Sequence, residues 1–223
     1  MENWNMRRNP HERPVDARTR RGPSWRSLLS ISGVVSVLAV LMIVPITPAD
    51  AYCTSGITRW TGSSYTLHVT PLIAGWNTSS VTNANAQWDN GNISGSTLNY
   101  NTPLYNQGLA FAYQASFANF SQVGLPNNIP GATSNSSGAT HASSWMRFNT
   151  TFTWNTSGTM NQAQKQADVR TVALHEMGHA SGLNHPSVCG AMTSAEIASA
   201  MNPNWTAKWT VNSDDKAGIA LRY

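Results

Sequence analysis

The sequence predicts an α+β domain in which a mixed β-sheet precedes a long helix, and three observations lead to this fold class. Alternating apolar residues near position 67 and an apolar run near position 112 are typical of β-strands. A longer helical pattern follows at 162–181. Strands that come first and a helix that follows them indicate an α+β or mixed-sheet domain. The 223 residues show no internal repeat and no second domain.

The first part of the domain is predicted to contain two strands and one helix. The segment RWTGSSYTLHVTP at 59–71 alternates apolar and polar residues and stops at a proline, which is typical of a strand. Apolar residues at helical spacing predict a helix within 77–92, where an Asn-Gly pair ends the pattern. The apolar run GLAFAYQASF at 108–117 predicts a buried strand.

The second part is predicted to contain a loop, a strand and two helices. Gly, Pro, Asn and Ser dominate 121–142, so we expect a long surface loop there. Alternation resumes in SWMRFNTTFTW at 144–154, which predicts a strand. A helix is expected over 162–181. A short terminal helix should follow Ser213, a residue type that can cap a helix.

Residues 1–51 have the layout of an export signal. An arginine-rich start is followed by the uncharged apolar run Leu28–Val44, and the small residues at 49–51 predict cleavage before Tyr52. The same run is long enough to span a bilayer, so a retained membrane anchor is the alternative. In either case we expect a single domain at 52–223 that works outside the cytoplasm, secreted or anchored to the outer face of the membrane.

The charge distribution argues against a nucleic-acid partner. The net charge is +4, but half of the basic residues lie in 1–51, and the 7 that remain are nearly balanced by 6 acidic residues. We therefore expect no nucleic-acid partner. We also expect a monomer, and membrane contact only if the apolar segment is retained. Two cysteines, Cys53 and Cys189, follow the predicted cleavage site. In an oxidising compartment an even pair predicts one disulfide, and two unpaired thiols are the alternative.

The segment TVALHEMGHASGLNHPSV contains the pattern H-E-x-x-H-x-x-G-x-x-H. His175 and His179 are four residues apart, so on a helix they lie one turn apart on the same face. Gly182 can adopt the left-handed conformation that ends a helix, which lets the chain turn back and brings His185 to the same ion. Three neutral imidazoles and an open fourth position are the ligand set of a catalytic zinc. Glu176 lies beside the ligand face, where a carboxylate can take a proton from water and pass it to a leaving amine.

A helix that carries histidines by chance is the competing interpretation of this segment. The five fixed positions are expected by chance with odds on the order of one in a hundred thousand for a chain of this length. The two isolated histidines of the domain, His68 and His141, fall in a predicted strand and a predicted loop, and we expect structural roles for them.

The segment HEMGHASGLNH resembles the zinc signature of the metzincin metalloendopeptidases, in which a methionine-containing turn follows the signature. SAMNPNW, which contains Met201, is similar to the matrixin (matrix-metalloproteinase-like) form of this turn. Met192 is the other candidate for the methionine of the turn. NSDDKAGIALRY resembles the terminal matrixin helix, and the segments at 59–69 and 77–88 are similar to the first strand and first helix of matrixins. The resemblance is to a minimal secreted matrixin without a recognisable propeptide.

The resemblance implies a metzincin-like zincin fold with a twisted mixed sheet, an active-site helix, a Met-turn and a C-terminal helix. It implies a secreted zinc-dependent endopeptidase that hydrolyses internal peptide bonds of extracellular proteins. One catalytic Zn²⁺ would be held by the three histidines, and Glu176 would be the general base for a zinc-activated water. Met201 would form the apolar floor beneath the metal. Asn202, Pro203 and Trp205 would line the pocket for the substrate side chain that follows the scissile bond.

The resemblance also implies that 145–149 is the edge strand along which an extended peptide pairs by β-augmentation.

Vertebrate matrixins hold a structural zinc and calcium ions before the catalytic helix, but here 127–149 contains one histidine and no carboxylate. A structural zinc is therefore not expected, and calcium has little support. A Cys53–Cys189 disulfide would tie the mature N-terminus to the loop after His185 and stabilise the fold by about 2–4 kcal/mol.

A secreted, tryptophan-rich binding module with a non-catalytic zinc is the second hypothesis. Exposed indoles stack well on glycans and other flat ligands. The tryptophans that could serve are Trp60, Trp76, Trp145, Trp154, Trp205 and Trp209. A binding module has no need of a carboxylate beside the metal, so a Glu176→Ala change should leave its function intact and should abolish proteolysis by an enzyme.

Overall fold

The computed structural model describes residues 53, 59–70, 75–105, 111–138 and 140–223. The predicted export signal and the alternative membrane anchor lie outside the described residues. Within the described ranges, no helix is both long and apolar enough to cross a membrane.

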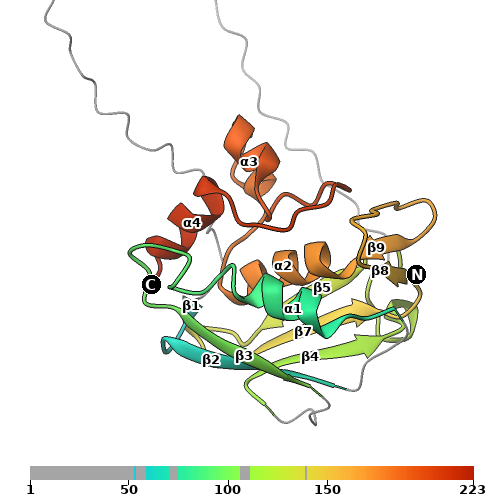
Figure 1. Cartoon of the computed structure of the whole chain (residues 1–223), viewed down its shortest axis with the longest axis horizontal. Coiled ribbons are helices and arrows are strands. Elements are labelled where there is room, and N and C mark those ends of the chain that lie inside the picture. The colour runs from blue at the N-terminus through green and yellow to red at the C-terminus, as the bar shows by residue number, and fades with distance from the viewer. Residues whose placement is uncertain (1–52, 54–58, 71–74, 106–110, 139) are drawn as a thin grey trace, which may run out of the picture. The chain divides into compact units, whose positions relative to one another are not determined.

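A five-stranded mixed sheet carries helix α2 (Val169–Ala180), which contains His175 and His179, on one face (Figure 1). Its strands are β2 (Ser64–Val69), β3 (Asn99–Tyr105), β4 (Tyr113–Ala118), β5 (Gly131–Asn135) and β7 (Ser144–Asn149). The strand order is β3-β2-β4-β7-β5, in which β5 is antiparallel to β7 and the other pairs are parallel. The predicted α+β class with a mixed sheet is therefore confirmed.

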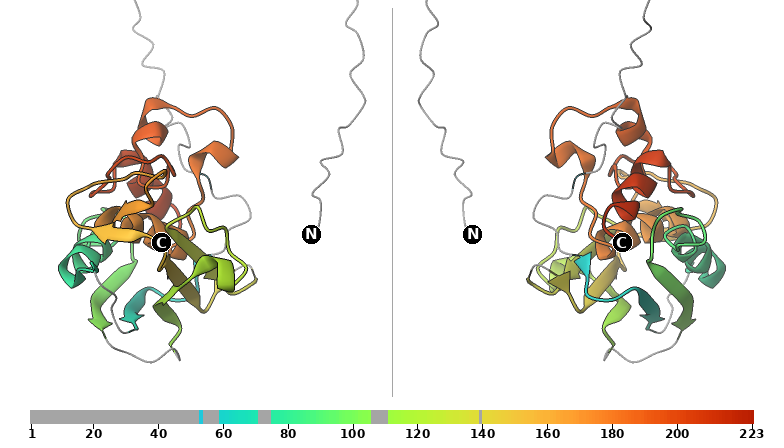
Figure 2. Two further views of the ribbon diagram at one scale, coloured as in Figure 1. Left: turned by 90° about the vertical axis from the view of Figure 1, so that its right-hand side faces the viewer. Right: turned by 90° about the vertical axis from the view of Figure 1, so that its left-hand side faces the viewer.

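Two small parallel pairs flank the main sheet. They join β1 (Arg59–Trp60) to β6 (Thr140–His141) and β8 (Thr153–Asn155) to β9 (Gln166–Asp168). The helices are α1 (Thr78–Asn85), α2 (Val169–Ala180), α3 (Ser194–Ala198) and α4 (Ser213–Ala220). Two 3₁₀ turns, η1 (Phe120–Gln122) and η2 (Pro186–Val188), complete the elements. Figures 1 and 2 show α1 and α2 against the sheet and α3 on the far side of α2.

The helices begin at polar side chains that accept hydrogen bonds from the first backbone N–H groups. Asn77 caps α1, and Asp168 caps α2 by accepting from Thr171 N at 2.8 Å. Asn212 caps α4, so the prediction that Ser213 is the cap was wrong by one residue. An asparagine side chain reaches the second and third N–H groups of this helix, and Ser213 becomes its first residue.

The active-site helix is shorter than predicted. It starts at Val169 and not at Gln162, because 166–168 pair with β8 as a strand and Lys165 adopts a positive φ of 49°. The polar run at 161–165 forms a turn before this strand. The predicted end near Ser181 agrees with the structure, in which Ser181 is the C-cap.

Two predictions about the second half of the sheet were wrong. The segment 121–142, expected to be a loop, contains β5, whose small polar residues pair with β7 through the backbone. The strand at 145–149 was expected to be an edge, but β7 lies between β4 and β5. The edge strand nearest the active-site helix is therefore β5, which contacts α2 directly.

The hydrophobic core fills the space between the sheet and the helices α1 and α2. Trp88 is fully buried and donates from its indole N–H to Leu174 O at 2.9 Å, which fixes the segment after α1 to the middle of α2. Met146 and Phe148 rise from β7 toward the same core. The core thus holds α2 rigidly over the sheet, and α2 carries the candidate site.

Candidate active site and metal centre

Three histidines converge at the end of α2. His175 and His179 lie one turn apart on the helix, and Gly182, with φ of 87°, ends the helix and turns the chain toward His185. The Nε2 atom of His185 lies 3.0 Å from the Nε2 atoms of both other histidines. In the part of the chain that the structure describes, this is the one group of three side chains able to hold a metal ion.

The histidine rings are oriented and neutral, as metal ligands must be. Nδ1 of His175 lies 2.8 Å from Ala200 O, and Nδ1 of His179 lies 2.8 Å from Leu183 O. A carbonyl oxygen only accepts, so each Nδ1 carries the proton and each Nε2 presents its lone pair to the cluster. Burial and the neighbouring imidazoles lower the pKa of His175 well below its usual value and that of His179 to about 4.

The spacing of these nitrogens fits a zinc ion. Zn–N bonds of about 2.0–2.1 Å in a tetrahedron place two ligand nitrogens roughly 3.3 Å apart, close to the 3.0 Å seen here. Lone pairs that converge at such a distance repel one another unless a cation lies between them. The cluster is therefore suited to a divalent metal such as zinc.

Glu176 places a buried carboxylate beside this cluster. It follows His175 on α2 and is 4% exposed. Its Oε2 accepts a hydrogen bond from Thr133 Oγ1 at 2.7 Å. Burial raises the pKa of Glu176 to about 7, and the bond from Thr133 opposes this rise. A carboxyl group with a pKa near neutrality is suited to accept and return a proton at physiological pH.

Strand β5 forms the wall opposite α2. A Cβ atom added to Gly131 would lie 2.5 Å from Glu176 Oε1, so the strand approaches the carboxylate more closely than any larger residue would allow. Asn135 Nδ2 donates to His179 O at 3.0 Å. These residues and Thr133 were missed from the sequence, because nothing in a Gly- and Asn-rich stretch distinguishes them from loop residues.

The turn that contains Met201 packs against α2. Met201 is 2% exposed, whereas Met192, the other candidate for this position, is 37% exposed. The Sδ atom of Met201 packs so closely on Gly178 of α2 that a side chain at position 178 would overlap it. A glycine in the last turn of the helix is therefore explained by the approach of Met201 and Trp88.

Asp215 of α4 fixes the shape of this turn. Its carboxylate accepts from Ser199 Oγ at 2.5 Å, from Ala200 N at 2.9 Å and from Asn212 N at 2.9 Å. A longer bond of 3.4 Å comes from Met201 N. Because Ala200 O in turn contacts His175 Nδ1, the carboxylate positions both the methionine and the first histidine.

The predicted disulfide is present between Cys53 and Cys189, with a Cα–Cα distance of 5.5 Å. Cys53 O also accepts from Asn184 N at 2.8 Å. Asn184 and Cys189 bracket the third histidine, His185, along the chain. The covalent bond and the hydrogen bond therefore hold the segment that carries this ligand.

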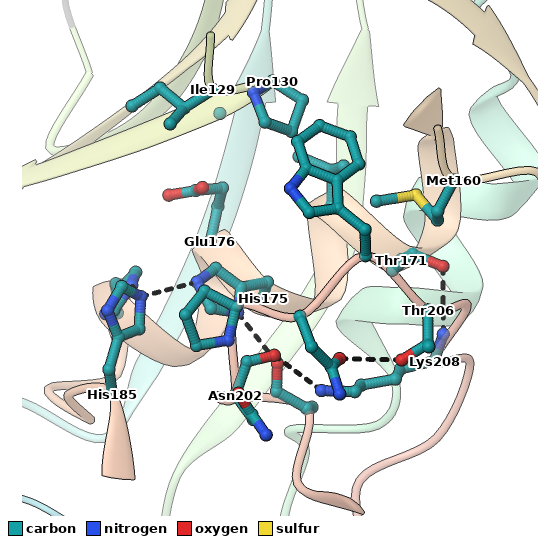
Figure 3. Close-up of a pocket in the computed structure, with 17 residues that line it drawn as sticks. Ile129, Pro130, Met160, Thr171, His175, Glu176, His185, Asn202, Thr206 and Lys208 are labelled. Atoms are coloured by element: carbon teal, nitrogen blue, oxygen red, sulfur yellow. Dashed lines mark hydrogen bonds between the residues drawn. The ribbon is translucent and has the colours of Figure 1, made fainter. Parts of the chain in front are cut away.

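A pocket of about 170 Å³ opens from the histidine cluster and runs along α2 (Figure 3). One wall follows the helix face that carries Thr171, His175 and His179. The other walls come from 129–131 at the start of β5, from Met160 and from the loop after Met201. The apolar residues that line the pocket are Ile129, Pro130, Met160, Val172 and Trp205. Asn202, Pro203 and Trp205, which the sequence placed at this pocket, all line it.

The isolated histidines and most tryptophans have structural positions. His141 is fully buried with Nε2 2.9 Å from Ala180 O, and His68 stacks on Phe111. Trp60 and Trp154 belong to the core. The binding-module hypothesis needs six tryptophans on the surface. All six lie in the described residues, and among them Trp209 alone is exposed, at 42%.

A helix with two histidines, a third histidine after a sharp turn, an adjacent buried carboxylate and a methionine turn packed against the same helix define a zinc metallopeptidase of the metzincin class. The family model of the matrixins matches residues 87–223. This is more than half of the chain, and the chain belongs to the matrixin family of zinc metallopeptidases. A comparison with curated proteins found no match.

Proposed function

We propose that this matrixin is a secreted endopeptidase that hydrolyses internal peptide bonds of extracellular proteins, with Glu176 as the general base. The observation that carries the proposal is the buried Glu176 carboxylate, held by Thr133 beside the three histidines and at the head of the pocket. A metal site that served binding alone would not need a proton acceptor in this position.

His175, His179 and His185 would hold the zinc ion. When bound, zinc polarises a peptide carbonyl and lowers the pKa of water at its open position. Glu176 accepts a proton from the attacking water at its carboxylate and returns it to the amine of the leaving peptide. Thr133 keeps one carboxylate oxygen oriented during this transfer.

The free edge of β5 would hold the substrate as an added strand. In the described residues β5 pairs with β7 on one side only, so its outward N–H and C=O groups can bond to an extended peptide. The side chain that follows the scissile bond would then enter the pocket along α2. We place the substrate on β5 and not on 145–149, because the latter strand is internal.

Export to an oxidising compartment agrees with the Cys53–Cys189 disulfide. We propose that 1–51 is a cleaved signal and that 52–223 is the catalytic domain, which acts as a secreted monomer. Retention of the apolar segment as an anchor on the outer face of the cell membrane is the alternative, and N-terminal sequencing of the exported protein separates the two.

The test compares the exported protein with its Glu176→Ala and Glu176→Gln variants. Zinc is measured by elemental analysis, and cleavage of unfolded casein is followed with and without a chelator. We expect about one zinc per chain in all three proteins, and cleavage by the parent alone, lost in the chelator. Zinc-loaded parent protein that cleaves no unfolded substrate, or a Glu176→Gln variant with full activity, would contradict the proposal.

A further inference from the structure

We propose that Lys208 makes the pocket selective for an acidic side chain, glutamate above all, in the substrate residue that directly follows the scissile bond. The inference rests on the proposed endopeptidase function and deepens it by naming a substrate class. It is carried by a cation that lines the pocket and that forms no ion pair with an acidic residue in the described part of the chain.

The side chain of Lys208 runs along the pocket wall. Its backbone N–H donates to Thr171 Oγ1 at 3.1 Å, at the end of the pocket away from His185, and its ammonium donates to Asn202 O at 2.6 Å (Figure 3). Trp209 Nε1 fastens the next residue to Asp168 at 2.9 Å. The ammonium is thus held at a defined place in the wall and not on a free surface chain.

The charge of this ammonium is not balanced within the described residues. No carboxylate there forms an ion pair with it, and Asn202 O is its one hydrogen-bond acceptor. The carboxylate that acts on it electrostatically, Asp215, is already occupied by donors from the Met-turn and α4. His175 and His185 are the other titratable groups that interact with it, and they are neutral.

Partial burial without a partner weakens the charged form, and the pKa of Lys208 falls to about 8. A half-buried cation with unused hydrogen-bond donors gains free energy when an anion arrives. Glu176, the other charged side chain that lines the pocket, is bonded to Thr133, so an acidic side chain of the substrate is the anion that we expect to reach this ammonium.

The rest of the pocket suits the methylene groups of a glutamate side chain. Ile129, Pro130, Met160 and Trp205 are apolar, and the pocket of about 170 Å³ extends along the helix from His175 to Thr171. Four residues of helix correspond to roughly 6 Å, which is similar to the length of a glutamate side chain. A shorter aspartate would reach the ammonium less well, and a lysine would be repelled by it.

The experiment uses the zinc-loaded exported protein and four peptides that differ only in the residue after the cleaved bond: Glu, Gln, Leu or Lys. Mass spectrometry confirms the cleavage position, and kcat/KM is measured for each peptide. Glutamine has nearly the shape of glutamate without its charge, so the ratio of Glu to Gln isolates the electrostatic part. We expect this ratio to be about tenfold, with the lysine peptide the poorest substrate.

Variants separate selection from a role in holding the loop. Lys208→Met should bring the ratio of Glu to Gln close to one, and Lys208→Arg should keep the preference. Lys216→Met, which removes a lysine on α4 that bonds to Asn92 outside the pocket, should not change the ratio. A Lys208→Met variant that slows all four peptides equally would show a loop-holding role and overturn the proposal.

Failure of the inference and failure of the proposed function give different results. Chelator-sensitive cleavage of the Gln and Leu peptides without preference for Glu overturns the selectivity of Lys208 and leaves the endopeptidase function standing. Absence of cleavage for all four peptides, with zinc bound, overturns both.

Discussion

A Gly178→Ala substitution tests how the Met-turn and α2 fit together. Gly178 lies in the last turn of α2, and glycine in a helix is about 1 kcal/mol less favourable than alanine. If helix propensity alone decided the outcome, the substitution would stabilise the protein by that amount. The structure leads to the opposite expectation.

A methyl group at position 178 would overlap Met201 Sδ and lie 2.9 Å from Trp88 Cζ2. Both partners are buried, and the indole is also held by its bond to Leu174 O, so neither can move away easily. Overpacking of this kind costs about 1–3 kcal/mol, and the overlap with two buried side chains places it near the upper end. After subtraction of the helix propensity, we expect a net loss of about 2 kcal/mol.

The free energy of unfolding should be measured by urea denaturation with tryptophan fluorescence, in the presence of a chelator so that zinc binding does not contribute. The matched control is a double-mutant cycle with Met201→Ala. Met201→Ala alone leaves a cavity and costs about 2–5 kcal/mol, but it makes room for the methyl group at position 178, so the double variant should lose less than the sum. A stabilised Gly178→Ala variant, or strictly additive effects, would refute the packing argument.

Three further predictions concern the supports and the charge of the site. Replacing Asp215 by asparagine should cost about 2–3 kcal/mol of unfolding free energy, because several donors lose their shared carboxylate; a loss under about 0.5 kcal/mol in urea melts would contradict this. Replacing Cys53 and Cys189 together by serine should cost about 2–4 kcal/mol and weaken zinc binding, and an unchanged melting temperature would count against it. The Glu-to-Gln ratio should hold below pH 8 and fall above it, as Lys208, with its pKa lowered to about 8, loses its charge; a ratio constant from about pH 6 to 10 would exclude this cause.

The candidate site was largely predictable from the sequence because its information is local. The four-residue spacing of His175 and His179 on a helix, and the glycine at 182 that turns the chain toward His185, depend on the geometry of a single segment. The Cys53–Cys189 disulfide could be inferred from the even count of cysteines in a domain that the sequence predicts to be exported. The start of α2 was predicted less well, because it depends on the pairing of 166–168 with another strand, β8.

The strand that faces the site could not be predicted because its stability comes from other parts of the fold. In β5, Gly131 and Thr133 have no apolar alternation to reveal a strand, and the pairing with β7 is made by backbone groups that every sequence has. β3 was missed for a similar reason, because its residues NYNTPLY are mostly polar and exposed. The sequence therefore could not identify Thr133 as the partner of Glu176, because the contact between them depends on the tertiary structure.

Among the described residues β5 pairs on one side only, and the substrate binding that we propose at its other edge has a consequence for the choice of substrates. The strand is five residues long, so a substrate paired with it must offer an extended segment of roughly 17 Å. In a folded protein such a segment becomes available only when the native structure opens locally, at a free-energy cost that varies from one region to another. The turnover of folded targets would then be governed by how often each one opens, so that a stable protein is spared and a locally frayed one is removed even when both contain the same cleavage sequence.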